Sequence, residues 1–94
     1  MPLFVMTCLD RPGALEVRMG AREAHLAYVR ERLGSVRLGG PLLDDDGRMA
    51  GSLLILDVAD QAAAEAFNRD DPYTQAGLFE RVEIRPFRIT VGQS

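Results

Sequence analysis

Four short apolar segments alternate with two segments of helical spacing, and this order limits the folds that the 94-residue chain can adopt. The first apolar run, residues 3–9, is too short to favour a helix and is followed by turn-forming residues, so it predicts a buried strand. Further strands are predicted at residues 35–43, 51–58 and 79–91, and helices at residues 15–33 and from the N-cap Asp60 to about residue 69. The order is therefore strand, helix, strand, strand, helix, strand.

This order is the split β-α-β arrangement of the α+β ferredoxin-like fold, in which two helices pack on one face of a four-stranded antiparallel sheet. We expect a single domain over residues 1–94, because a chain of this length cannot form two cores. Residues 53–56 are consecutive large apolar residues, so both faces of the sheet carry apolar groups. We therefore expect a second copy of the chain to cover the open face, giving a homodimer.

The predicted first helix has an apolar stripe that we expect to face the sheet. Its members recur at helical spacing and are Leu15, Met19, Leu26, Val29 and Leu33. Gly34 follows this stripe as the expected C-cap of the helix. His25, the only histidine of the chain, lies at the edge of the stripe.

Composition and charge exclude several classes of protein. The formal net charge is -3, and all 11 basic residues are scattered arginines, so the basic surface of a general nucleic-acid binder is missing. The single cysteine, Cys8, has no partner for an internal disulfide and is expected in the core. The first residues lack the basic region of a signal peptide, and no apolar run approaches the ~20 residues of a membrane span. We expect a cytoplasmic protein that binds neither membrane nor nucleic acid.

His25 is the first candidate for chemistry, because imidazole titrates near neutral pH and a neighbouring carboxylate can make it a general acid or base. The sequence contains many carboxylates and does not indicate which one meets it. A half-buried histidine with a purely structural role is the alternative. The second candidate is Asp71, which Pro72 would hold rigidly at the end of the second helix, pointing into a cleft. The alternative for this segment is a helix stop followed by a turn.

Two glycine-containing segments form a third candidate feature. Gly39-Gly40-Pro41 and Gly51-Ser52 would either bring backbone N–H groups close to a ligand or merely kink a hairpin. The sequence contains no nucleophile elbow around Ser52, no glycine-rich phosphate loop and no cluster with metal-ligand spacing. We therefore expect no bound metal.

Several short motifs follow one another over nearly the full chain, and their order and spacing are together more specific than any one of them. They are Asp10, Arg18 and Arg22 leading to His25-Leu26, Gly39-Gly40-Pro41, Gly51-Ser52, Asp71-Pro72-Tyr73, Gly77-Leu78 and residues 82–87. With these motifs the chain resembles the YciI-like (YCII-related) family of small bacterial proteins.

The resemblance implies a ferredoxin-like fold that pairs as a dimeric α/β barrel, with a pocket around a histidine and an aspartate that correspond to His25 and Asp71. A member of the family is described as a dehydrochlorinase of a chlorinated hydroxyquinol, and the wider fold group includes muconolactone isomerase. The implied function is a cofactor-free enzyme of lyase, isomerase or dehydrochlorinase type. Its substrate would be a small oxygenated molecule with an aromatic or lactone ring.

In this hypothesis His25 moves a proton and Asp71 orients the imidazole and stabilises its cationic form. Arg18 or Arg22 would hold an anionic oxygen of the substrate, and Ser52 would add a hydrogen bond. The full set of residues expected to bind the substrate is Arg18, Arg22, Gly40, Pro41, Ser52 and Tyr73.

Two other functions stay open at the level of the sequence. The first is a non-catalytic dimeric module that binds a small metabolite or accompanies a pathway enzyme, in which the same pocket gives affinity without turnover. The second is a haem- or flavin-dependent monooxygenase of the related dimeric barrel class, although no feature of the sequence demands either cofactor.

Overall fold

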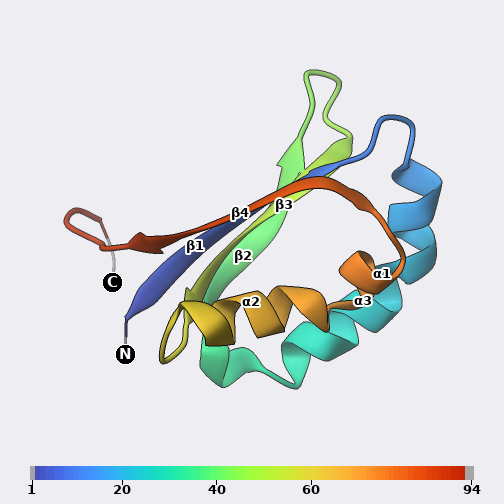
Figure 1. The fold of residues 1–94 in the computed structure, drawn as a ribbon. Helices are drawn as coiled ribbons and strands as arrows, with labels where there is room; N and C mark the ends of the chain where they lie inside the picture. The colour runs from blue at the N-terminus through green and yellow to red at the C-terminus, as the bar shows by residue number, and fades with distance from the viewer. Residues whose placement is uncertain (1, 93–94) are drawn as a thin grey trace.

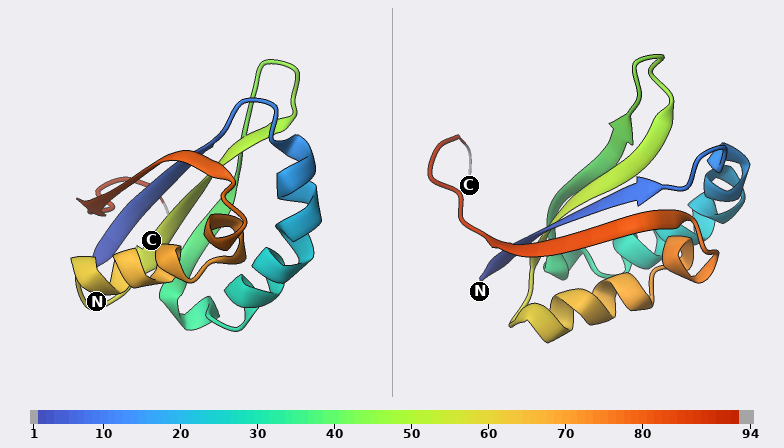
Figure 2. Two further views of the ribbon diagram at one scale, coloured as in Figure 1. Left: turned by 45° about the vertical axis from the view of Figure 1, so that its right-hand side comes forward. Right: turned by 45° about the horizontal axis from the view of Figure 1, so that its top comes forward.

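The computed structural model, which describes residues 2–92, contains a four-stranded antiparallel sheet in the order β2-β3-β1-β4 (Figure 1). The strands are β1 (Leu3–Asp10), β2 (Val36–Leu43), β3 (Met49–Asp57) and β4 (Phe79–Phe87), and the helices are α1 (Leu15–Arg30), α2 (Gln61–Arg69) and α3 (Pro72–Gln75). Figure 2 shows the helices on one side of the sheet and the other side open. The predicted ferredoxin-like fold is confirmed, with α3 as an additional short helix.

The core lies between the sheet and the helices. It consists of residues that are less than 10% exposed, namely Phe4, Met6, Cys8, Tyr28, Leu54, Leu56, Val58, Ala64 and Phe67. Side chains alternate across a strand, and the antiparallel register places Met6 of β1 opposite Leu54 of β3 on the helix side. The hydroxyl of Tyr28 donates a hydrogen bond of 2.8 Å to the carbonyl oxygen of Phe67, which ties α1 to α2.

The face that α1 turns toward the sheet differs from the predicted apolar stripe. Leu15, Met19 and Leu33 are 39%, 52% and 63% exposed. The buried residues of the helix are Arg18, His25 and Tyr28. The prediction is wrong for the three exposed residues, because it assumed that the inward face must be apolar throughout, whereas Val29 of the stripe does pack against the core. Polar side chains occupy that face here, and each of them has a partner inside the fold.

The ends of several elements also differ from prediction, most clearly those of α1, β3 and β4. α1 ends at Arg30, and Gly34 lies in a 3-10 turn that follows the helix, so it is not the C-cap. β3 begins at Met49, two residues before the predicted start, and β4 ends at Phe87 and not at residue 91. Asp60 is the N-cap of α2 as predicted, and its side chain accepts a hydrogen bond of 2.8 Å from the amide of Ala63.

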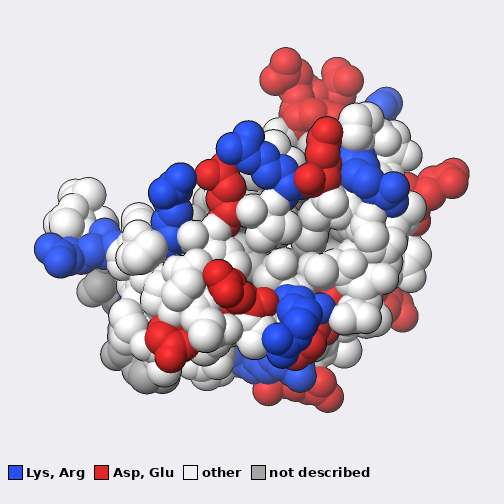
Figure 3. All heavy atoms as spheres, in the orientation of Figure 1, with Lys and Arg blue, Asp and Glu red and all other residues white. Residues whose placement is uncertain are grey.

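The open face of the sheet combines apolar and charged residues. β1 and β3 contribute Val5 and Ile55, which face each other across the pairing, while β4 contributes Arg85 opposite Val5. On the face of the molecule seen in Figure 3, acidic and basic side chains are interspersed around a broad uncharged area, and acidic ones gather over the β2–β3 turn. None of the helices within residues 2–92 is both long enough and apolar enough to cross a membrane.

Candidate active site

His25 and Asp71 form a buried pair between α1 and the start of α3. The Nδ1 atom of His25 lies 2.8 Å from Oδ1 of Asp71, whose residue is only 1% exposed. α1 brings the histidine to the helix side of the sheet, and the end of α2 brings the aspartate to the same place from the other half of the chain. Because a carboxylate oxygen accepts, the Nδ1 atom carries the proton in this pair.

Asp71 has a second role as the N-cap of α3. Its Oδ1 atom accepts a hydrogen bond of 2.9 Å from the amide of Tyr73, and Pro72 occupies the first turn of the helix. The segment predicted only to stop α2 therefore begins a new helix. Gly77, with a φ of 70°, ends it in the left-handed conformation that glycine adopts without strain. The carboxylate is thus fixed by backbone geometry as well as by the imidazole.

Tyr73 packs flat on the imidazole of His25. The two ring centroids are 3.9 Å apart and the rings are inclined by 12°. On the same tyrosine ring lies the guanidinium of Arg18, with its Cζ atom 4.6 Å from the ring centroid. Burial raises the pKa of the Tyr73 hydroxyl, and the nearby guanidinium groups of Arg18 and Arg22 oppose that rise. The stack holds His25 in one orientation.

Arg18 is bound by a carboxylate and a hydroxyl. Its Nε and Nη2 atoms donate to the two carboxylate oxygens of Asp10 at 2.7 and 2.8 Å, and Nη2 also donates to Oγ of Ser52 at 3.0 Å. Arg18 and Ser52 are 2% and 4% exposed. These contacts join α1 to β1 and β3. The positive charge of Arg18 is already neutralised by Asp10 within the fold.

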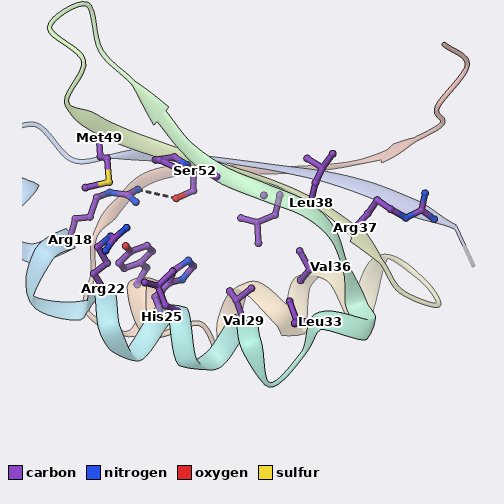
Figure 4. A pocket seen from close by; sticks show the side chains of 16 residues that line it. Arg18, Arg22, His25, Val29, Leu33, Val36, Arg37, Leu38, Met49 and Ser52 are labelled. Carbon is purple, nitrogen blue, oxygen red and sulfur yellow. Dashed lines mark hydrogen bonds between the residues drawn. The ribbon is translucent and has the colours of Figure 1, made fainter. Parts of the chain in front are cut away.

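These residues meet at a pocket of about 280 Å³ between α1 and the strands β2 and β3 (Figure 4). Its walls include every residue predicted to bind the substrate, namely Arg18, Arg22, Gly40, Pro41, Ser52 and Tyr73, together with His25. Asp71 does not line the pocket and lies behind His25. The structure therefore brings the predicted residues together, while their roles toward a ligand stay a prediction.

The structure distinguishes between the two arginines that the sequence left as alternatives for an anionic oxygen. Arg18 is neutralised by Asp10, as described above. Arg22 lies one helical turn further along α1 and lines the pocket, and its guanidinium forms no ion pair with any carboxylate in residues 2–92. Arg22 is thus the cation that remains available to a ligand.

The two glycine-containing segments have different roles, because Gly39, Gly40 and Pro41 all line the pocket whereas Gly51 serves the packing of two strands. At Gly51 a Cβ atom would collide with the carbonyl oxygen of Cys8, so this glycine is needed for the close approach of β3 to β1. Gly51 does not line the pocket, whereas its neighbour Ser52 does. Gly39 packs against Leu54, and Gly40 has open space beside it.

Cys8 is a core residue, as predicted. Its side chain is fully buried, and burial, together with the negative charges of Asp71 and Asp10, raises the pKa of the thiol from 9.0 to about 12. A thiol in this state is not a nucleophile at neutral pH.

Sequence reasoning missed Asp10 as the partner of Arg18 and missed the apolar wall of the pocket. That wall is made of Leu26, Val29, Leu33, Val36, Leu38 and Leu54. Helical spacing did group three of these residues, but it assigned them to the core. In the part of the chain that the structure describes, no three His, Cys, Asp or Glu side chains gather as ligands for a metal ion.

Comparison with known proteins finds a matching family model and similar sequences. Residues 2–88 match the family model of the YCII-related domain. Protein YciI of Escherichia coli is 33% identical over 94 residues, which span 92% of this chain and 96% of that protein. A protein of Haemophilus influenzae is 31% identical over 90% of this chain and 95% of its own length.

Two solved structures show the range of the similarity. The 5-chloro-2-hydroxyhydroquinone dehydrochlorinase of Burkholderia phenoliruptrix, in complex with 2,5-dihydroxybenzoquinone, has a TM-score of 0.85 and 36% identity. The match covers 92% of this chain and 93% of that one. An antibiotic biosynthesis monooxygenase has a TM-score of 0.59 at 10% identity, with 97% of this chain and 100% of that one covered. This second likeness shows a shared fold alone.

Proposed function

The chain belongs to the YCII-related family, and on this basis we propose that it is an acid–base enzyme in which His25 and Asp71 transfer a proton to or from a small oxygenated ring. The observation that carries the proposal is the buried contact of 2.8 Å between Nδ1 of His25 and Asp71, at the wall of a pocket that also contains Arg22. The reaction is of the lyase, isomerase or dehydrochlorinase type, and the ring is aromatic or a lactone.

The tautomer of His25 supports this role. Asp71 accepts a hydrogen bond from the N–H group of Nδ1, so the Nε2 atom of the neutral ring has a free lone pair and acts as the base. When Nε2 takes a proton, the adjacent carboxylate stabilises the imidazolium. The flat packing of Tyr73 keeps the ring in place during both steps. Arg22 would bind an oxygen of the substrate that becomes or remains negatively charged.

A dehydrochlorination can be written with these groups alone. In the keto tautomer of a chlorinated hydroxyquinol, chlorine sits on a saturated carbon. The Nε2 atom of His25 takes a hydroxyl proton, the O–H electron pair becomes part of a C=O bond, and the ring electrons shift toward the chlorinated carbon. The C–Cl bond then breaks and its electron pair leaves on chloride. The net change is the loss of HCl, which needs no oxidant or reductant.

The structural relative supports this substrate class. That protein is a dehydrochlorinase of 5-chloro-2-hydroxyhydroquinone. Its sequence is 36% identical to the present chain, and its structure matches with a TM-score of 0.85. We extend the reaction type to this chain because its pocket combines a base, a free cation and a hydroxyl, which are the groups that such a ring needs.

The test is to incubate the full chain with 5-chloro-2-hydroxyhydroquinone and with a panel of other hydroxylated quinols and lactones, and to measure chloride release and product absorbance. We expect turnover on at least one ring, and its loss in His25→Ala. The control is Arg30→Gln, an exposed residue of the same helix that does not line the pocket. Turnover that survives His25→Ala contradicts the mechanism, whereas shifts in melting temperature without turnover indicate a binding module.

We also propose that the chain forms a homodimer through the open face of its sheet. Leu9 of β1 is 47% exposed on that face, and the apolar pair Val5 and Ile55 lies on the same face four residues away along the strand. Apolar strands without a cover usually mark an interface. A cytoplasmic location and the absence of membrane and nucleic-acid partners stay predictions of the sequence.

A further inference from the structure

The pocket has two chemically different ends along α1 (Figure 4). At one end lie the polar side chains of Arg18, Arg22, His25, Ser52 and Tyr73. At the other end lie the apolar side chains of Val29, Leu33 and Val36, and in Figure 4 these stand on the opposite side of the pocket from Arg18 and Ser52. Arg37 also lines this end, and its guanidinium pairs with Asp57 at 3.4 Å. A ligand that fills the whole pocket therefore meets charge at one end and hydrocarbon at the other.

The pocket is longer than a single ring bound at its polar end would need. Arg22 and Val29 are seven residues apart on α1, which corresponds to ~10 Å along the helix axis. The pocket volume of about 280 Å³ is close to the ~300 Å³ at which pockets begin to accommodate drug-sized ligands. A single oxygenated ring held at Arg22 and His25 would leave the apolar end filled only with water.

The exposure of the apolar end supports a ligand contact. Leu33, in the 3-10 turn after α1, is 63% exposed, and Leu38 of β2 is 56% exposed. Both line the same pocket. Large apolar side chains that converge on one concavity gain free energy when a ligand removes them from water.

We propose that the natural substrate is an amphipathic anion, in which an oxygenated ring bound at Arg22 and His25 carries an apolar arm that lies against Val29, Leu33 and Val36. This inference rests on the proposed function for the position of the ring, and it adds the arm. Arg22 binds a negatively charged oxygen of the ring, because Arg18 is already neutralised by Asp10. The arm gives selectivity over smaller rings that carry the same oxygen atoms.

The test is a homologous series of ligands. We would measure the dissociation constants of 2,5-dihydroxybenzoquinone and its 3-methyl, 3-propyl and 3-pentyl derivatives with the full chain by calorimetry. Each added methylene should tighten binding about fourfold while the apolar wall continues. A dissociation constant that does not change along the series overturns the inference.

Two variants locate the arm. Leu33→Gln together with Val29→Thr should reduce the gain per methylene to less than about twofold and leave the unsubstituted quinone unaffected. Leu33 is exposed, whereas Val29 also packs against the core, so Leu33→Gln alone is measured beside the double variant, and the melting temperature of both confirms that they are folded. Leu43→Gln is the matched control, because Leu43 is 60% exposed and lies outside the pocket. An unchanged gain per methylene in the double variant overturns the assignment of the arm to this wall.

A second series separates this inference from the proposed function. Straight-chain carboxylates from propanoate to octanoate contain an anion and an arm but no ring. If they show the gain per methylene and no quinone binds, the arm is supported and the proposed ring substrate is wrong. If quinones bind and turn over without any gain in either series, the proposed function stands and the arm is wrong. The molecular mass of Leu33→Gln is measured by light scattering. If this mass differs from that of the wild type while neither series shows a gain in affinity per methylene, the apolar end is a contact between two copies of the chain, and the inference is wrong.

Discussion

The imidazole of His25 and the carboxylate of Asp71 are 46 positions apart in the sequence and 2.8 Å apart in the structure. The same carboxylate oxygen accepts the amide of Tyr73, so the pair is coupled to the backbone at the start of α3. A catalytic histidine whose partner is fixed by the main chain needs no rearrangement before it accepts a proton.

Asp71→Asn should separate orientation from binding. The amide can present an N–H group to Nδ1 and then favours the wrong tautomer, so kcat on the chlorinated hydroxyquinol should fall by about 100-fold or more while KM changes little. Asp70→Asn is the matched control, because Asp70 is exposed and pairs with the exposed Arg69. Equal kcat values for the two variants would remove Asp71 from the mechanism.

Arg22→Gln should weaken the binding of an anionic ligand. A hydrogen bond to a charged group contributes roughly 1.5–3 kcal/mol, which corresponds to an increase of at least about tenfold in the dissociation constant of 2,5-dihydroxybenzoquinone. The free energy of unfolding should stay within about 0.5 kcal/mol of the wild type, because Arg22 is exposed and forms no ion pair in residues 2–92. Arg30→Gln should leave binding unchanged, and an equal loss in both variants would argue for a general effect of net charge.

Arg18 and Asp10 should behave as a single structural unit. Removing one member leaves a buried charge without a partner, so Arg18→Met and Asp10→Asn should each lower the free energy of unfolding by about 3–5 kcal/mol. The double variant should lose less than the sum of the two, and urea titrations of all four proteins measure this coupling. Additive losses would show that the two side chains act independently.

Alkaline conditions should destabilise the fold through groups that are buried in the neutral form. Burial raises the pKa of Cys8 to about 12, and it also raises the pKa values of Tyr28 and Tyr73. The unfolded chain releases the thiol proton near 9.0, so this contribution to stability is complete below that pH and is lost as the pH rises toward 12. No lysine is present to obscure the effect.

Urea unfolding at about pH 8 and at about pH 10.5 measures this loss, and the part due to Cys8 is on the order of 2 kcal/mol. Cys8→Ala should show a smaller decrease between the two conditions, because only the tyrosines then contribute. A free energy of unfolding that does not depend on pH in this range would contradict the raised pKa values.

Leu9→Asp should disrupt the proposed homodimer. Leu9 is 47% exposed on the open face of the sheet, where a carboxylate would be buried by a second copy. Light scattering at micromolar concentration should give twice the chain mass for the wild type and the single mass for this variant. Met19→Asp, on an exposed position of α1, should remain dimeric. A monomeric wild type would overturn the homodimer.

The order of elements was predictable because each short segment carries its own signal. The apolar run of β1, the N-cap of α2 and the turns between strands are local features, and right assignments of six segments suffice to limit the topology. The ends of elements were less predictable. Gly34 looks like a C-cap in sequence, but the chain changes to a 3-10 turn there because the helix already ends at Arg30.

The orientation of α1 could not be predicted from its apolar stripe. Periodicity assigns apolar residues to the core, and on this helix Arg18 and His25 are buried in their place. Such an exchange is stable only when each buried polar group finds a partner, and those partners lie on β1 and before α3. No local pattern on the helix contains that information.

The sequence by itself determined the order of strands and helices. It also contained a single histidine, and motifs spread over the chain indicated which polar residues belong to one site. Only the tertiary structure decided that Asp71 is the carboxylate that meets His25 and that Asp10 neutralises Arg18, while Arg22 has no ion pair within residues 2–92. It also decided that Leu26 and Val29 of α1 line a pocket. Pairing partners depend on contacts between distant segments, and the sequence specifies these contacts only through the packing of the whole fold.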